Sequence, residues 1–230
     1  MAGFLFGQCA PDFQGVCQIS RQATHFYDIP QSGDVAEAYQ QMWQEYPALA
    51  SPAGMPPAQA VFIAGYCAHL LLDLCWYWHI LWPQFLNATD WPADRRQRFL
   101  VHNILLTYLD KMAFEALPVP AGQILAAAQP ATWLPFADDQ CLIRWRDLLT
   151  PQLQPGANLE TIDIYATRLR MTPSDFASHL ADPRWMMTEV FNKISLDYVQ
   201  TVLADGVDQT VQFLNQYLSK CQALVDPHSL

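Results

Sequence analysis

The apolar positions of this chain show little of the two-residue alternation that half-buried strands require. They fall instead in stretches bounded by proline and capping residues, which is typical of helices. No internal repeat and no glycine-rich phosphate loop interrupts the pattern. The predicted helices cover residues 35–46, 58–82, 93–116, 141–149, 158–170, 173–181 and 184–225, the last broken around Asp205 and Gly206. The pattern therefore predicts an all-α fold.

Prolines and one capping residue set the expected helix boundaries. Asp34 can cap the first helix, and Pro47 closes it. Pro83 is expected to end the second helix, because proline lacks the N–H that a helix interior requires. Pro118 and Pro120 stop the third. Residues 1–33 read as irregular chain with turns, and the Pro- and Ala-rich segment 117–140 as a connection with room for one short helix. Residues 1–230 are expected to form one domain, in which 117–140 is a candidate linker.

The stretch from Val61 to Trp82 has two interpretations. Its 22 mostly apolar residues are enough to span a bilayer. However, the stretch contains His69, Asp73 and His79, and one Asp near a bilayer centre costs about 2.5–3.5 kcal/mol on insertion scales. A helix that lies in the core of a soluble protein and carries an inward polar stripe explains the same residues without this cost.

Composition and charge narrow the function classes. The chain is 52% hydrophobic and 15% charged, and its 29 aromatic residues predict a large aromatic core. The net charge of −10 argues against nonspecific binding of nucleic acid or of anionic lipid. Six cysteines without a C-x-x-C pair are expected to be reduced, buried thiols. The first residues lack a basic segment and a long apolar run, so we expect a cytoplasmic protein.

Candidate chemistry begins with His69 and Asp73. Four residues apart on a helix, they project from one face and can hold one divalent ion such as zinc. A His–Asp hydrogen bond inside a packed core is the alternative. An ionised Asp among Leu, Trp and Tyr needs a strong partner, which leaves both interpretations open. His79 lies roughly 80° around the helix from His69, so it would serve a neighbouring ion.

A second string, Thr24-His25-Phe26-Tyr27-Asp28, brings in a resemblance. Followed by His-x-x-x-Asp and a further His six residues later, it resembles the bacterial zinc-dependent phospholipase C family, which belongs to a helical superfamily with single-strand nucleases. The Pro11-Asp12 turn is similar to the catalytic-Asp region of that family. The similar motifs span residues 5–80, about a third of the chain.

The resemblance implies a multi-helix bundle of the phospholipase C type and a set of metal ligands. His25, His69 and Asp73 would bind a first zinc ion, and Asp12 would handle the attacking water as the catalytic carboxylate. His79 and His102 would bind a second zinc ion. For Asp12 an ordinary turn residue is the alternative, and for His102 an ordinary core or surface histidine.

The chain departs from the family pattern at the second and third zinc ions. The carboxylate expected four residues after His102 is replaced by Leu106. Asp110, roughly 80° away around the helix, is a possible substitute ligand, as is Glu115. The family uses an amino-terminal Trp for a third ion, whereas this chain begins with Met1, so no third site is expected. One zinc site, with a second as an option, is what the residues support.

Two functions follow as hypotheses. The first is a metal-dependent hydrolase of phosphoric esters, phospholipase C-like, in which zinc activates a water and the substrate is a small phosphoester or a phospholipid. Arg21 would contact the phosphate, with an ordinary surface residue as the alternative. Trp76 would line the mouth of the site, with packing in the core as the alternative. The second is a non-catalytic helical protein whose metal stabilises the fold or helps to bind a ligand. Retention of Asp12 favours the first, and Leu106 favours the second.

Overall fold

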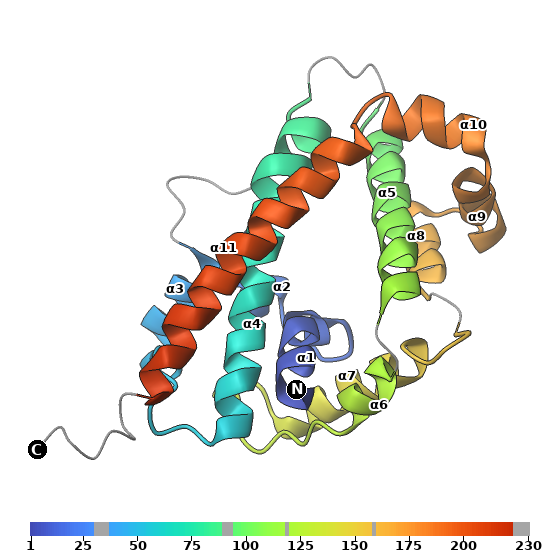
Figure 1. Cartoon of the computed structure of the whole chain (residues 1–230). Helices are drawn as coiled ribbons and strands as arrows, with labels where there is room; N and C mark the ends of the chain where they lie inside the picture. Colours follow the sequence, from blue (N-terminus) through green and yellow to red (C-terminus); the bar gives the residue numbers. More distant parts are fainter. Residues whose placement is uncertain (30–36, 89–93, 118–119, 158–159, 223–230) are drawn as a thin grey trace, which may run out of the picture. The chain divides into compact units, whose positions relative to one another are not determined.

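The computed structural model describes residues 1–29, 37–88, 94–117, 120–157 and 160–222 (Figure 1). These residues form helices joined by turns, and no strand occurs among them. The prediction of an all-α fold is confirmed. Asp34, the expected cap of the first predicted helix, lies outside the described residues.

The chain divides into two compact units, each assembled from separate segments. The first unit comprises Met1–Leu74, Gly122–Pro151 and Ala204–Leu230, and the second comprises Cys75–Ala121 and Gln152–Leu203. That residues 1–230 act as one domain stays a prediction.

The first unit is built from short amino-terminal helices around one long helix. Its elements are α1 (Ala2–Cys9), η1 (Ala10–Gly15), α2 (Arg21–His25), α3 (Ala38–Glu45), η2 (Pro47–Leu49) and most of α4 (Pro57–Trp76), α6 (Ala121–Ala126), α7 (Asp139–Gln152) and α11 (Leu196–Gln222). The single short helix predicted within 117–140 is confirmed as α6. The irregular chain predicted for 1–33 is wrong where α1, η1 and α2 lie, because these elements have too few turns to show a helical period.

Helices α1 and α4 cross with their backbones almost in contact. A Cβ atom at Gly7 would lie 2.1 Å from the Phe62 carbonyl oxygen, and one at Gly65 would lie 2.3 Å from the Phe4 carbonyl oxygen. Only glycine permits so close an approach. The crossing holds α1 against the part of α4 that carries His69.

Aromatic stacking joins α3 to the carboxyl-terminal half of α11. The ring centroids of Trp43 and Tyr217 lie 5.7 Å apart, and Phe213 stacks on both rings. The Tyr217 hydroxyl donates a hydrogen bond to the Leu49 carbonyl oxygen (2.9 Å). The predicted break around Asp205 and Gly206 is wrong, because α11 continues through both residues. We attribute the continuity of the helix to this packing. A glycine inside a helix costs only about 1 kcal/mol, which such packing can offset.

The second unit is a helical cluster around an apolar core. Its elements are η3 (Tyr77–Leu86), α5 (Arg95–Ala116), α8 (Thr161–Leu169), α9 (Pro173–Ala181), α10 (Pro183–Trp185), η4 (Met186–Phe191) and the start of α11. Tyr77, Ile80, Ile104 and Phe176 are among its buried residues. The predicted helix 173–181 is confirmed as α9, which Thr172 caps by accepting the Asp175 N–H.

Pro83 does not end the long helix as predicted. The π-helical segment η3 follows α4 directly and extends to Leu86 with Pro83 inside it. A proline removes the N–H that would bond the carbonyl four residues earlier, which here belongs to His79. The Tyr198 hydroxyl donates to that carbonyl instead (3.0 Å). The wider turn also provides a replacement bond, from the Asn87 N–H to the Trp82 carbonyl oxygen (2.8 Å).

Among the described residues, the stretch Pro57–Leu86 is long and apolar enough to cross a membrane. Length and composition are the whole of this evidence, and 56% of its most apolar window is buried within the protein. The core helix of a soluble protein has the same properties, so the stretch does not by itself indicate a membrane protein.

Two of the six cysteines form a disulfide, between Cys17 and Cys141. The prediction of reduced thiols is wrong for this pair, because a sequence separation of 124 forms no recognisable spacing motif. Cys9, Cys67 and Cys75 are thiols outside the disulfide. Cytoplasmic location stays a prediction, and the disulfide favours an oxidising compartment instead.

Candidate metal centre

The short helix α2 and the turn that ends it position His25. Ser20 caps α2 by accepting the Ala23 N–H (3.2 Å), and Phe26 ends it in a left-handed conformation with φ of 61°. A left-handed conformation is uncommon for a bulky residue and costs about 1–3 kcal/mol. The Phe26 ring is held between Tyr46 and Phe136, which offsets this strain.

The His25 ring is oriented by the residue before it. Its Nδ1 lies 2.9 Å from Thr24 Oγ1, and the Thr24 hydroxyl donates its single proton to the Arg21 carbonyl oxygen (3.1 Å). The hydroxyl can therefore only accept from the ring, which puts the proton of neutral His25 on Nδ1. The lone pair of Nε2 then faces the site. This is the arrangement that metal-binding histidines usually show.

His69 repeats this arrangement on α4. Its Nδ1 lies 2.8 Å from the backbone carbonyl oxygen of Gln8 at the end of α1, so Nδ1 carries the proton of the neutral ring. Its Nε2 is buried and has no hydrogen-bond partner among the described residues. A buried lone pair without a partner is costly unless a cation or a proton-bearing group occupies the space beside it.

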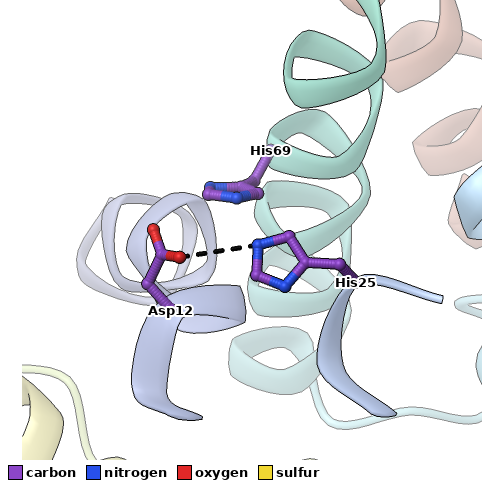
Figure 2. A group of neighbouring side chains, drawn as sticks. All are labelled: Asp12, His25 and His69. Carbon is purple, nitrogen blue, oxygen red and sulfur yellow. Dashed lines mark ion pairs between the residues drawn. The ribbon is translucent and has the colours of Figure 1, made fainter. Parts of the chain in front are cut away.

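Asp12, on η1, supplies a carboxylate to the two imidazoles (Figure 2). Its Oδ1 lies 3.5 Å from His25 Nε2, and the ligand atoms of Asp12, His25 and His69 all lie within 4.8 Å of one another. Ligands about 2 Å from a tetrahedral zinc ion are about 3.3 Å apart, so small side-chain movements suffice. The structure thus contains a possible three-ligand metal site.

The pKa shifts of His25 and Asp12 favour the protonation states in which these two residues would bind a metal. Burial, the largest cause, lowers the pKa of His25 below its ordinary value. Burial alone would raise the pKa of Asp12, but the contact with His25 and the charges of His69, His25 and Arg21 outweigh it and lower the pKa. A neutral imidazole at His25 and an ionised carboxylate at Asp12 are the forms in which these two residues would bind a divalent cation.

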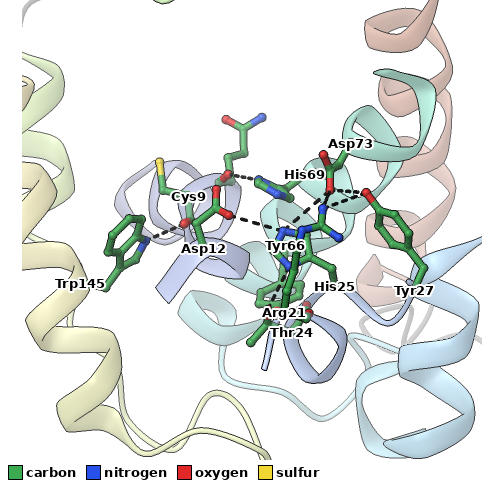
Figure 3. A network of polar contacts seen from close by, with 11 residues as sticks. Cys9, Asp12, Arg21, Thr24, His25, Tyr27, Tyr66, His69, Asp73 and Trp145 are labelled. Atoms are coloured by element: carbon green, nitrogen blue, oxygen red, sulfur yellow. Dashed lines mark hydrogen bonds and ion pairs between the residues drawn. The ribbon is translucent and has the colours of Figure 1, made fainter. Parts of the chain in front are cut away.

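Asp73 lies at the edge of this group and has other partners. Its Oδ2 forms an ion pair with Arg21, accepts a hydrogen bond from the Tyr27 hydroxyl (2.5 Å), and lies 3.8 Å from His25 Nε2 (Figure 3). Arg21 also donates to the Tyr27 oxygen (2.9 Å). The role of Asp73 as a zinc ligand stays a prediction, and the three converging ligand atoms do not include it.

One guanidinium nitrogen of Arg21, beside the metal group, has no hydrogen-bond partner among the described residues. Its Nη2 serves Asp73 and Tyr27, whereas its Nη1 is buried without a partner among the described residues. A guanidinium held by a carboxylate and with a free N–H can bind an oxyanion. The predicted phosphate contact at Arg21 therefore lies next to the candidate ligands.

The residues proposed for a second zinc ion lie in the second unit. His79 is exposed on η3, and His102 and Asp110 are both on α5. His102 is 7% exposed, and its Nε2 accepts a hydrogen bond from the Trp76 indole (3.1 Å). No second group of three converging ligands occurs in the part of the chain that the structure describes. The ligand roles of these residues, and the substrate role of Trp76, stay predictions.

Acid is expected to destabilise the protein through His102. Burial lowers the pKa of His102 from 6.5 to about 4, so the unfolded chain takes up this proton more readily than the folded protein. The stabilisation by neutral His102 is therefore complete above pH 6.5 and is lost as the pH falls toward 4. Between pH 7 and pH 4.5, we expect the free energy of unfolding to fall by about 2 kcal/mol more in wild type than in His102→Gln. Urea denaturation at both pH values measures this, and equal losses would contradict it.

Sequence reasoning missed three partners of the site. The Gln8 carbonyl, the Thr24 hydroxyl and the Tyr27 hydroxyl orient His69, His25 and Asp73. Thr24 and Tyr27 lie within two residues of His25 in the motif, so their positions could have indicated that they contact the site. A backbone carbonyl carries no signal in a sequence.

No protein-family model matches the chain, and neither a curated protein nor a solved structure is significantly similar to it.

Proposed function

We propose that the chain is a metal-dependent hydrolase of phosphoric esters, similar to the zinc-dependent phospholipases C, with one zinc ion at Asp12, His25 and His69. The observation that carries the proposal is the convergence of two imidazoles on one carboxylate, while the Nδ1 atom of each imidazole is engaged elsewhere. The buried, unpartnered Nε2 of His69 fits a metal ligand better than a core histidine.

Three protein ligands with an open side are typical of catalytic rather than structural zinc sites. The Asp12 side chain is 51% exposed whereas that of His25 is 1% exposed, so the group opens toward solvent on the carboxylate side. A zinc ion bound there would supply an activated water and polarise a phosphoryl oxygen. Thr24 and the Gln8 carbonyl would keep the two imidazoles in the ligand tautomer.

The charges of the site indicate which ester it accepts. Asp12, Asp73 and Arg21 give the network one net negative charge, and a divalent cation changes this to one net positive charge. A phosphodiester carries a single negative charge and would neutralise it. The unpartnered Nη1 of Arg21 would donate to a phosphoryl oxygen, while Asp73 and Tyr27 hold the guanidinium in place. A small phosphodiester or phospholipid is the proposed substrate class.

The second candidate is a non-catalytic protein whose metal stabilises the fold. One observation favours it: Leu106 stands where the family has a carboxylate, and the Nε2 of His102 already accepts the Trp76 indole. A second ion would therefore lack a preformed site in the described part of the second unit.

The test combines metal analysis with hydrolysis of bis(4-nitrophenyl) phosphate. We expect one equivalent of zinc, hydrolysis that a chelator abolishes and zinc restores, and an Arg21→Gln variant that keeps its zinc but has KM raised about tenfold. Loss of one charged hydrogen bond to an anion, worth about 1.5–3 kcal/mol, explains the change. Arg168→Gln, at an exposed arginine of the second unit, is the control. One zinc without turnover would favour the non-catalytic candidate, and no bound metal would refute both.

A further inference from the structure

The segment that carries Asp12 is fastened to α7 at both of its ends. At the first end, the Trp145 indole N–H donates to the Cys9 carbonyl oxygen (2.6 Å; Figure 3). At the other end, Cys17 forms the disulfide with Cys141. Between them, the Trp145 ring lies beside η1, 4.0 Å from where a Cβ on Gly15 would be. We call the disulfide and the Trp145 hydrogen bond together the clasp.

The position of Asp12 depends on the clasp, whereas the two histidines are oriented by hydrogen bonds of their own. The His25 and His69 rings are each oriented by a hydrogen bond to Nδ1. The Asp12 carboxylate is half-exposed, and its ion pair is with the ring of His25, 3.5 Å away. Its place in the group is therefore set by the backbone of η1, a short 3₁₀ element whose hydrogen bonds are weaker than those of an α-helix.

We infer that Cys17, Cys141 and Trp145 are positioning residues for Asp12, and that reduction of the Cys17–Cys141 disulfide lowers the affinity of the site for zinc. The inference rests on the proposed metal centre and adds redox control to it. Substitution of a residue that orients a metal ligand typically lowers metal affinity by 10- to 100-fold. Opening the disulfide frees one end of the segment, so Asp12 would spend less time beside the two imidazoles.

The surroundings of the disulfide suit reversible reduction. Cys17 is half-buried, so part of this residue is accessible to an external thiolate. Arg144 Nη2 lies 3.1 Å from Cys141 Sγ and 3.5 Å from Cys17 Sγ, where its charge stabilises whichever thiolate leaves. A dithiol is the proposed reductant. Its two sulfurs give up two electrons and two protons and join in a disulfide, while Cys17 and Cys141 become thiols.

The closing experiment measures zinc and cobalt(II) binding to the whole chain in three forms. These are the oxidised protein, the protein reduced with a phosphine, and Cys17→Ser/Cys141→Ser, which lacks the two thiols that reduction creates and that could themselves bind metal. We expect the zinc Kd to rise 10- to 100-fold in the last two. Their cobalt(II) spectra should resemble that of oxidised Asp12→Ala, since each lacks the same ligand. Cys75→Ser, at a cysteine of the second unit that is outside the disulfide, should match oxidised wild type.

A second variant tests the clasp with its disulfide intact. Trp145→Phe keeps the ring beside η1 but removes the N–H that bonds Cys9, and we expect a zinc Kd raised about tenfold in oxidised protein. Equal zinc affinity and an unchanged cobalt spectrum in the reduced, serine and phenylalanine forms would overturn the inference and leave the metal centre intact. Absence of metal binding in oxidised wild type would overturn both.

Discussion

Gly65→Ala is expected to lower the free energy of unfolding by about 3 kcal/mol or more, close to the upper end for overpacked sites. The added Cβ would lie 2.3 Å from the Phe4 carbonyl oxygen and 3.1 Å from the Gln8 nitrogen, and these backbone atoms cannot move aside independently of α1. Alanine would by itself favour the helix by about 1 kcal/mol, so the loss measures the crossing of α1 and α4. Urea denaturation provides the measurement.

The matched control is Gly15→Ala, where the new Cβ would have a single neighbour at 4.0 Å, an ordinary contact. We expect it to change stability by less than about 1 kcal/mol. Gly65→Ala should also weaken zinc binding, because displaced α1 carries the Gln8 carbonyl that orients His69. Similar losses for both variants would show that the crossing is not as tight as the distances indicate.

His69→Ala and His25→Ala are each expected to reduce zinc affinity at least a hundredfold. A structural zinc site is worth about 10–16 kcal/mol in small domains, so one ligand of three contributes several kcal/mol. Both variants should also lose the rise in Tm that zinc gives wild type. Equilibrium dialysis and thermal melts with and without zinc measure the two effects. His179→Ala, whose ring lies against Trp185 in the second unit, should bind zinc as wild type does.

Asp73→Asn separates two assignments of this carboxylate. The sequence predicts a zinc ligand, whereas the structure gives its Oδ2 to Arg21 and Tyr27. We therefore expect the variant to retain one equivalent of zinc. A loss as large as that of His69→Ala would restore the prediction from the sequence.

Much of the candidate site could be predicted because its residues lie in short motifs. The Thr24–Asp28 string and the helical spacing of His69 and Asp73 are local features, and the structure brings their side chains within a few ångströms of one another. The convergence of Asp12 could not be derived from spacing, because it depends on a 3₁₀ turn and on distant contacts from α7. The resemblance supplied that residue, with a different role.

The fold was predictable where helices are long and their boundaries local. Helix α9 begins after a capping threonine and matches the expected range. Errors arose where a distant side chain compensated for a helix-breaking residue, as Tyr198 does at Pro83. Helix α5 shows the local case, since Leu117, the residue before Pro118, is already extended as proline requires.

Both ends of the chain belong to the unit that holds the candidate metal group, while the second unit is drawn from interior segments. Successive deletions from either terminus would therefore first remove parts of the unit that holds the candidate metal group. No continuous fragment contains that unit alone, because its segment Gly122–Pro151 is separated from the others along the chain. A minimal zinc-binding version would require joining three separate pieces with new linkers, rather than choosing new end points.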